Sequence, residues 1–147
     1  MRFTYKYFQE GQISRNFTWE EMTKSETARK YKIENTPDAA ACNAIEELVV
    51  RLLQPLRVVY GKQIRITSGF RSYAVNKLVG GAPRSLHLKG EAADCKVRDA
   101  SKLLDVLLES GLPFDQAILY KKRNFLHLSL RCGSHIKNRQ QVIINEE

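Results

Sequence analysis

The chain has 147 residues, of which 43% are apolar and 27% charged, and its formal net charge is +8. These values are ordinary for one globular domain that buries its own core, and no segment has the composition of a linker or a low-complexity tract. No stretch approaches the roughly 18 apolar residues of a membrane span, and the first residues contain no apolar signal segment. We therefore expect a single soluble domain over residues 1–147, made in the cytoplasm.

The cysteines and the charge narrow the class of protein further. Cys42, Cys95 and Cys132 are odd in number and lack C-x-x-C spacing, which argues against a disulfide framework and a thiolate zinc cluster. The positive charge suits a nucleic acid, an anionic cell-wall polymer or a carboxylate-bearing peptide. Because the basic residues are scattered and form no helical stripe, a solvated basic surface explains the charge more simply.

A first short helix is predicted over residues 18–29. Thr18 suits its N-cap, with Glu21 placed to reach back, and Phe17 and Met22 are placed as a hydrophobic staple. This pattern fixes where the helix begins more firmly than where it ends.

The main amphipathic helix is predicted to follow, with Thr36 as its N-cap and Pro37 at the first helical position. Apolar residues then recur at helical spacing from Cys42 to Leu56. A kink is expected near Pro55, because proline interrupts the backbone hydrogen bonds of a helix.

The second half of the chain predicts mostly strands, because short alternating stretches lie between glycine-containing turns. A short helix over residues 73–78 and a capped amphipathic helix over residues 99–111 interrupt them. Helices gathered mainly ahead of a small, mostly antiparallel sheet indicate an α+β domain. Strands are expected over residues 63–67, 91–97, 114–120 and 124–131, with a last strand or packed extension over 140–145.

Two of these strands carry polar residues that point away from the apolar rows. Period-two alternation places Asp94 in SLHLKGEAADC (85–95) and His127 in NFLHLSL (124–130) on the polar sides of their strands. With His87 they have the composition of a catalytic zinc site, in which three protein ligands leave a position for water. From spacing alone, surface histidines and an aspartate at a strand end remain the alternative.

The motifs TSGFRS, SLHLKGEAADC and FLHLSL, in this order, resemble those of the D-alanyl-D-alanine metallopeptidases. These are zinc peptidases of peptidoglycan peptides, and their fold is shared with the hedgehog signalling domain and several phage endolysins. The likeness covers roughly residues 14–145, and the FTWEEM and NTP stretches are typical of small phage and bacterial members. The resemblance implies one Zn²⁺ ion, held by His87, Asp94 and His127.

The resemblance also implies residues that contact the substrate. Arg71 in SGFRS corresponds to a family arginine at the substrate, where a guanidinium binds a carboxylate or stabilises an oxyanion; a salt-bridging loop residue is the alternative. Ser68 and Ser85 are candidates for hydrogen bonds to ligands or substrate, or for capping turns. Small residues around Gly90 are expected to let chain and substrate approach the metal closely.

The chain departs from the family pattern at the proton acceptor. Many relatives have an acidic residue shortly before the last zinc histidine, whereas this chain has YKKRNFL there. Asp115 is the preferred acidic candidate, because alternation places Glu91 on the opposite side of its strand from Asp94. Tyr120 is expected to help stabilise an oxyanion, and His135, in a turn, is expected to have no role at the site.

Three functions follow, in order of preference. The first is a zinc-dependent peptidase of peptidoglycan stem peptides, acting as a carboxypeptidase or an endopeptidase after release to the cell wall, as phage endolysins do. The second is a wall-binding module of the same fold with weak or no catalysis, which the missing acidic residue favours. The third, a nucleic-acid binder, rests on the net charge alone. We expect a monomer.

Overall fold

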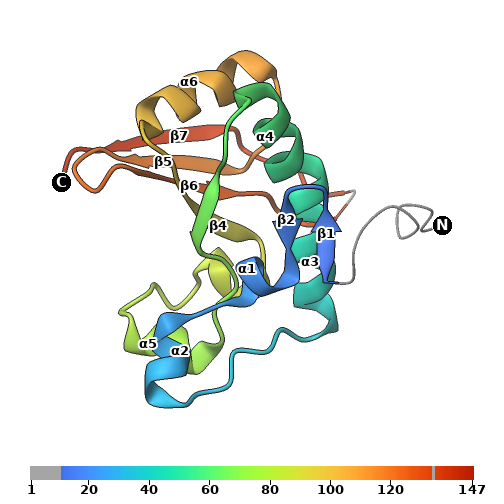
Figure 1. Ribbon diagram of the computed structural model, residues 1–147, viewed down its shortest axis with the longest axis vertical. Coiled ribbons are helices and arrows are strands. Elements are labelled where there is room, and N and C mark those ends of the chain that lie inside the picture. Colours follow the sequence, from blue (N-terminus) through green and yellow to red (C-terminus); the bar gives the residue numbers. More distant parts are fainter. Residues whose placement is uncertain (1–10, 134) are drawn as a thin grey trace.

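The computed structural model describes residues 11–133 and 135–147, and over these ranges the chain forms an α+β domain (Figure 1). Within these ranges the larger sheet has five strands in the order β3-β4-β6-β5-β7. Neighbouring strands run antiparallel except β5 and β7, which are parallel. The predicted α+β class with a mostly antiparallel sheet is therefore confirmed. The strands are β3 (Arg65–Ser68), β4 (Ala92–Lys96), β5 (Gln116–Tyr120), β6 (Phe125–Ser129) and β7 (Gln141–Asn145).

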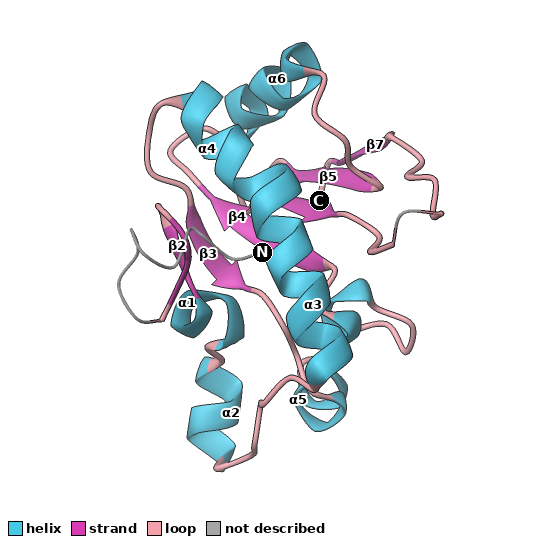
Figure 2. Cartoon of the chain, turned by 90° about the vertical axis from the view of Figure 1, so that its right-hand side faces the viewer, coloured by secondary structure: helices cyan, strands magenta, loops and turns pink. Residues whose placement is uncertain are grey.

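The core lies between one face of this sheet and the helices α3 (Ala39–Leu48), α4 (Gln54–Tyr60) and α6 (Ala100–Ser110), as Figure 2 shows. Alternation sends Leu126 and Leu128 of β6 into this core, where both side chains are completely buried. Burial of each such leucine stabilises the fold by about 1.5–3 kcal/mol. The other face of β4 and β6 is free of these helices, and it is the face that bears the polar residues of the strands.

The main helix begins later than its sequence predicts. Asp38, not Thr36, is the N-cap, because its carboxylate accepts a hydrogen bond from Ala41 N at 2.8 Å. The irregularity expected near Pro55 is a π-helical turn over Val49–Leu53 that joins α3 to α4. Pro55 follows in the first turn of α4, where its missing N–H is tolerated because the wider turn ahead of it has already changed the hydrogen-bond pattern.

The prediction of a single helix over residues 18–29 is wrong, since the structure has α1 (Trp19–Thr23) and α2 (Glu26–Tyr31) instead. The chain becomes extended between them, and Ser25 caps α2 by accepting a hydrogen bond from Ala28 N at 3.1 Å. A second cap inside the predicted helix therefore restarts it in a new direction. Ahead of α1, β1 (Gln12–Ser14) and β2 (Phe17–Thr18) form a short antiparallel pair.

The start of α1 follows the prediction. Thr18 caps it by accepting a hydrogen bond from Glu21 N at 3.1 Å, and Phe17 and Met22 are both completely buried. Glu21 does not reach back as a capping box requires, because its carboxylate accepts from Ile66 N at 3.4 Å on β3. The helix is thereby fastened to the edge of the larger sheet.

Two short helical segments flank the polar face of the sheet. They are α5 (Tyr73–Leu78), which lies beside α2 (Figure 1), and η3 (Leu86–Lys89), a 3₁₀ turn that leads into β4. Gly90 ends η3 with φ +74°, and a Cβ there would lie 2.6 Å from the carbonyl oxygen of Ala41 on α3. Gly90 is thus required for packing against α3, not for access to the polar face as predicted. No helix in the described ranges is long and apolar enough to cross a membrane.

Candidate metal centre

The register of β4 and β6 places Asp94 directly opposite His127. Both side chains leave the sheet on the face away from the helices, as the alternation predicts, and both are half-buried. The Nδ1 of His127 lies 2.9 Å from Oδ1 of Asp94. Neighbouring strands thus supply two of the three predicted metal ligands at fixed separation.

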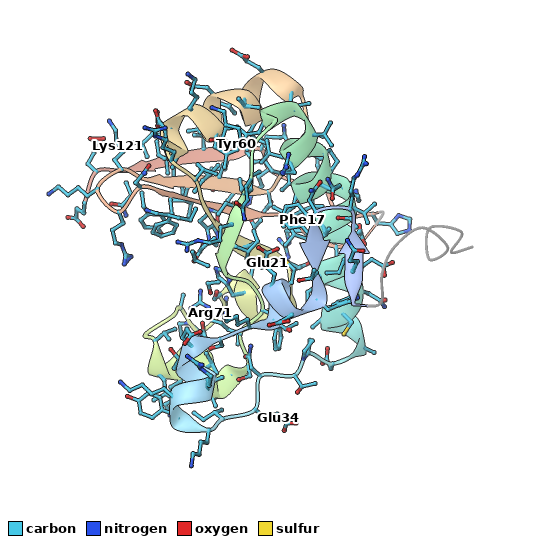
Figure 3. The ribbon with its side chains drawn as sticks, in the orientation of Figure 1. Phe17, Glu21, Glu34, Tyr60, Arg71 and Lys121 are labelled. Carbon is cyan, nitrogen blue, oxygen red and sulfur yellow. The ribbon has the colours of Figure 1, made fainter. Side chains whose placement is uncertain are left out.

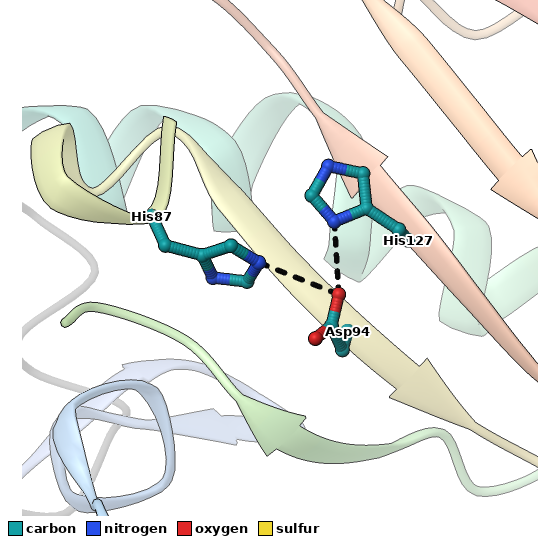
Figure 4. Close-up of side chains that lie close together, drawn as sticks. All are labelled: His87, Asp94 and His127. Atoms are coloured by element: carbon teal, nitrogen blue, oxygen red, sulfur yellow. Dashed lines mark hydrogen bonds and ion pairs between the residues drawn. The ribbon is translucent and has the colours of Figure 1, made fainter. Parts of the chain in front are cut away.

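The third residue, His87, comes from η3 and lies against the same carboxylate (Figure 4). Ser85 begins this turn by accepting a hydrogen bond from His87 N at 3.2 Å. The His87 ring is buried, and its Nε2 lies 3.4 Å from Oδ1 of Asp94. The potential ligand atoms of His87, Asp94 and His127 all lie within 4.8 Å of one another.

The hydrogen bonding of His87 suits a metal ligand. Its Nδ1 lies 2.7 Å from the carbonyl oxygen of Gly69, which can only accept, so Nδ1 carries the proton. In the neutral ring Nε2 then presents a lone pair, and it has no hydrogen-bond partner in the described part of the chain. A buried lone pair that faces a carboxylate oxygen is satisfied by a cation between the two groups. Two imidazoles and one carboxylate fit a zinc ion with an open fourth position.

The charge of Asp94 is favoured by its neighbours. Burial by itself raises the pKa of this carboxyl, but the hydrogen bond with His127 and the close approach of the His87 ring outweigh the burial and lower the pKa well below its usual range. Asp94 is therefore an anion at neutral pH, as a metal ligand must be.

The turn that carries the Gly69 carbonyl is fastened from two sides. Phe70 N donates to the carbonyl oxygen of Met22 at 2.8 Å, and α1 lies so close that a Cβ on Gly69 would be 2.3 Å from that oxygen. On the other side Asn35 accepts a hydrogen bond from Ser72 N at 2.7 Å and donates to the carbonyl of Phe70 at 3.1 Å. Gly69 and Asn35 therefore hold the partner of His87 in place. The sequence prediction misses both, although the glycine of SGFRS was a visible signal.

Arg71 lies beside the three ligand residues, at the junction between the sheet and the α2–α5 side of the molecule (Figure 3). It lines the same cleft as His87, Asp94 and His127, a space of about 570 Å³. Burial lowers the pKa of its guanidinium while the charge of Asp94 opposes that shift, and the group remains a cation at neutral pH.

The guanidinium of Arg71 is held close to the loop after α5 and keeps donors free. A Cβ on Gly81 would lie 2.8 Å from Nη1 of Arg71, so a larger residue at position 81 would displace the guanidinium. The buried Nε of Arg71 has no hydrogen-bond partner among the described residues. A cation with an unsatisfied donor in a cleft is suited to bind an anionic or strongly polarised oxygen.

The other predicted substrate contacts occupy different positions around this cleft. Ser68 stands opposite Asp94 in the β3–β4 register and lines the cleft, as does Tyr120 at the end of β5. The Tyr120 ring stacks on Phe125 with 4.4 Å between ring centroids. Ser85 also lines the cleft, although its hydroxyl accepts the capping hydrogen bond of η3. These three residues thus lie where a bound molecule would touch them.

Asp115 is not placed as a proton acceptor requires. Its side chain is completely buried, and its oxygens accept hydrogen bonds from Nε and Nη2 of Arg139 at 3.1 and 2.8 Å. These bonds lower its pKa, which makes the carboxylate a weaker base. It lines a neighbouring cleft rather than the one that contains Arg71. The geometry therefore gives no support to the predicted role of Asp115.

Glu91 and His135, which are predicted from the sequence to have no role at the site, lie away from the cluster of ligand residues. The Glu91 carboxylate is buried on the other side of β4 and accepts a hydrogen bond from Cys132 N. His135 is exposed in a turn. Glu26, at the start of α2, lines the cleft and was not predicted. Besides Asp94, it is the carboxylate that this cleft contains within the described residues.

Metal-dependent hydrolases combine such an open set of two imidazoles and a carboxylate with a cation that can bind substrate, and the cluster beside Arg71 has this composition. The chain matches the family model described as Peptidase M15 over residues 15–129 and belongs to this family. The predicted resemblance to the D-alanyl-D-alanine metallopeptidases is thereby confirmed, and with it the assignment to the metallopeptidases. A search of curated proteins finds no match.

Proposed function

We propose that the protein is a zinc peptidase that hydrolyses peptide bonds in peptidoglycan stem peptides, as a D,D-carboxypeptidase or an endopeptidase. The observation that supports this most is the lone pair of His87 Nε2, buried and aimed at the Asp94 carboxylate. With His127 the donor set is two nitrogens and one oxygen, which favours zinc over the oxygen-preferring Mg²⁺ and Ca²⁺.

Held by His87, Asp94 and His127, a zinc ion would supply Lewis-acid chemistry, which polarises a carbonyl and lowers the pKa of water enough to generate a nucleophile near neutral pH. The chain supplies the rest of the chemistry. The free donors of Arg71 bind the substrate carbonyl oxygen as negative charge develops on it, or the terminal carboxylate of the substrate. The hydroxyls of Tyr120 and Ser68, on the same cleft, orient the peptide by hydrogen bonding.

A wall-binding module with weak or absent catalysis is the second candidate. It is favoured because neither carboxylate among the described residues of the cleft is well placed to accept a proton. Asp94 faces both histidines, and Glu26 is mostly exposed beside Lys24 and Arg29. A peptidase needs a group that accepts a proton from water and returns it to the leaving amine. Without such a group the fold still binds a peptide in the cleft.

The test is digestion of purified muropeptides by the zinc-loaded protein, followed by mass spectrometry. Loss of one terminal residue indicates a carboxypeptidase, and separation of crosslinked peptides indicates an endopeptidase. Co-sedimentation with purified cell wall in the absence of products supports the binding module. If neither products nor binding is observed with any of several wall chemistries, both functions are contradicted.

We further propose that the protein acts as a monomer and meets the wall after release from the cytoplasm. The family supports a peptide as its partner. Light scattering after size-exclusion chromatography gives the molecular mass in solution, and a dimer would overturn the first statement. Absence of DNA binding at low salt would exclude the nucleic-acid hypothesis, which the net charge of +8 alone motivates.

A further inference from the structure

A second cleft lies against the metal site on the other side of His127. It encloses about 680 Å³, and His127, Ser85 and Ala82 line both clefts. A molecule bound at the metal residues therefore has two directions in which to extend. One leads past Arg71, and the other leads into the second cleft.

The second cleft is strongly basic. Its lining includes four basic side chains and one carboxylate, Asp115, which is already paired with one of the four. These basic residues come from separate parts of the sequence, and the fold brings them together in a concave site next to the ligands. We call this site the basic cleft, defined by Arg84, Lys89, Arg131 and Arg139.

The pairing with Asp115 fixes one of these cations in place. Arg139 donates to the buried carboxylate through Nε, Nη2 and its backbone N, the last at 3.0 Å. This two-pronged contact leaves Nη1 outside the pair, and the Arg139 side chain is 54% exposed. Asp115 is thus a positioning residue that presents the guanidinium at the surface of the basic cleft.

The loop that bears Arg131 and Arg139 is itself held to the sheet. Arg131 N donates to Oδ1 of Asn138 at 2.8 Å, and Gln141 N donates to the carbonyl of Asp115 at 3.0 Å. The backbone at Arg131 is therefore fixed, and the Arg139 guanidinium, which is paired with Asp115, has a defined position before any ligand binds. This lowers the entropy lost on binding.

We propose that the basic cleft binds a free carboxylate of the peptide substrate, on the side of the scissile bond opposite to Arg71, and that it selects acidic over amidated peptides. This proposal rests on the proposed peptidase function, because the ligand must be continuous with the group bound at His127. The anionic groups that a peptide offers are carboxylates, and a planar guanidinium pairs with a carboxylate in two-pronged fashion.

The test uses a stem pentapeptide that ends in D-alanyl-D-alanine, in two forms that differ only in whether its glutamate carboxyl is free or amidated. The zinc-loaded full chain is compared with the double variant Arg84→Gln/Lys89→Gln, whose side chains are exposed and form no ion pair within the described residues. Lys62→Gln/Lys102→Gln is the matched control, because it removes the same charge on the helical side of the sheet. Fluorescence anisotropy in the first seconds after mixing gives affinity, and mass spectrometry gives turnover.

We expect the wild-type chain and the control to bind the acidic peptide about tenfold more tightly than the amidated one, and the double variant to lose most of this preference. The preference should weaken as salt is raised, because the cations of the cleft are partly exposed. Equal affinity of the wild-type chain for both peptides, or a preference that the double variant keeps, would overturn the proposal. Failure to cleave either peptide, with the binding preference intact, contradicts the carboxypeptidase function and leaves the carboxylate site standing.

Discussion

The Nε2 of His87 lies 3.4 Å from Oδ1 of Asp94, while its Nδ1 lies 2.7 Å from the carbonyl of Gly69. The carbonyl determines which ring nitrogen carries the proton, so the remaining lone pair is aimed at a carboxylate oxygen. This arrangement is unfavourable without a cation between the two groups, and the predictions on the metal follow from it.

Replacing any one of His87, Asp94 and His127 by alanine should lower zinc affinity by about 100-fold or more, because each change removes one of three protein ligands. Metal content after dialysis measures this, and added zinc should raise the melting temperature of the wild-type chain but not of the variants. His135→Ala is the control, since His135 is exposed and outside the cluster. Unchanged zinc affinity in Asp94→Ala would contradict the three-ligand assignment.

Arg71→Ala should retain the metal and lose activity. Because its guanidinium faces the cleft with free donors, we expect kcat/KM on muropeptides to fall by about 100-fold or more, as when an oxyanion donor is removed. Arg71→Lys should recover part of this loss, since it restores the charge but not the planar donor pair. Metal content and circular dichroism check that site and fold persist. Wild-type turnover by Arg71→Ala would remove Arg71 from the site.

Gly69→Ala should weaken both the fold and the metal site, because its Cβ would lie 2.3 Å from the backbone oxygen of Met22. Gly61→Ala is the matched control: its φ is +75° but nothing lies within 4 Å of the added carbon, so only backbone strain is introduced there, about 1 kcal/mol. We expect Gly69→Ala to lower the free energy of unfolding by more than the control and to reduce zinc affinity. If Gly69→Ala and Gly61→Ala destabilise the fold equally and zinc binding is unchanged, the prediction is contradicted, because α1 then shifts without moving the Gly69 carbonyl.

The Asp115–Arg139 pair should make the free energy of unfolding depend on pH in the acidic range. Arg139 lowers the pKa of the Asp115 carboxyl below its ordinary 3.8, so the pair contributes stability above that value and loses it as pH falls through the lower folded-state pKa. Asp115→Asn should therefore cost about 1 kcal/mol at pH 7, and its deficit relative to wild type should shrink as pH falls below about 4. Denaturant titrations at several pH values measure this, and a deficit independent of pH would contradict it.

The same Asp115→Asn variant separates the two roles considered for this carboxylate. A proton acceptor would lower kcat by about 100-fold or more when removed. A positioning residue for Arg139 should leave kcat on the amidated peptide near the wild-type value and raise KM for the acidic one. We expect the second result. A large loss of kcat on both peptides would restore Asp115 as the proton acceptor.

Local patterns in the sequence were sufficient for several elements and for the ligand residues. Helix α6 begins after Asp99 and ends at Gly111, as predicted, because caps act within one turn of the chain. Alternation correctly places Asp94 and His127 away from the core, since strand geometry sends neighbouring side chains to opposite faces. The motif order then indicated the family.

Only the tertiary structure decided which of several local options was used. Thr36 and Asp38 are both residue types that cap helices, and in the folded chain Asp38 is the one that does so. Likewise, Asp115 and Arg139 are 24 residues apart, and no local rule predicts that they pair. Helix and strand periods are fixed by backbone angles within a few residues, so a sequence displays them directly. Contacts such as Gly69 with Met22, or the meeting of two clefts at His127, depend on how distant segments pack, and they exist only in the folded chain.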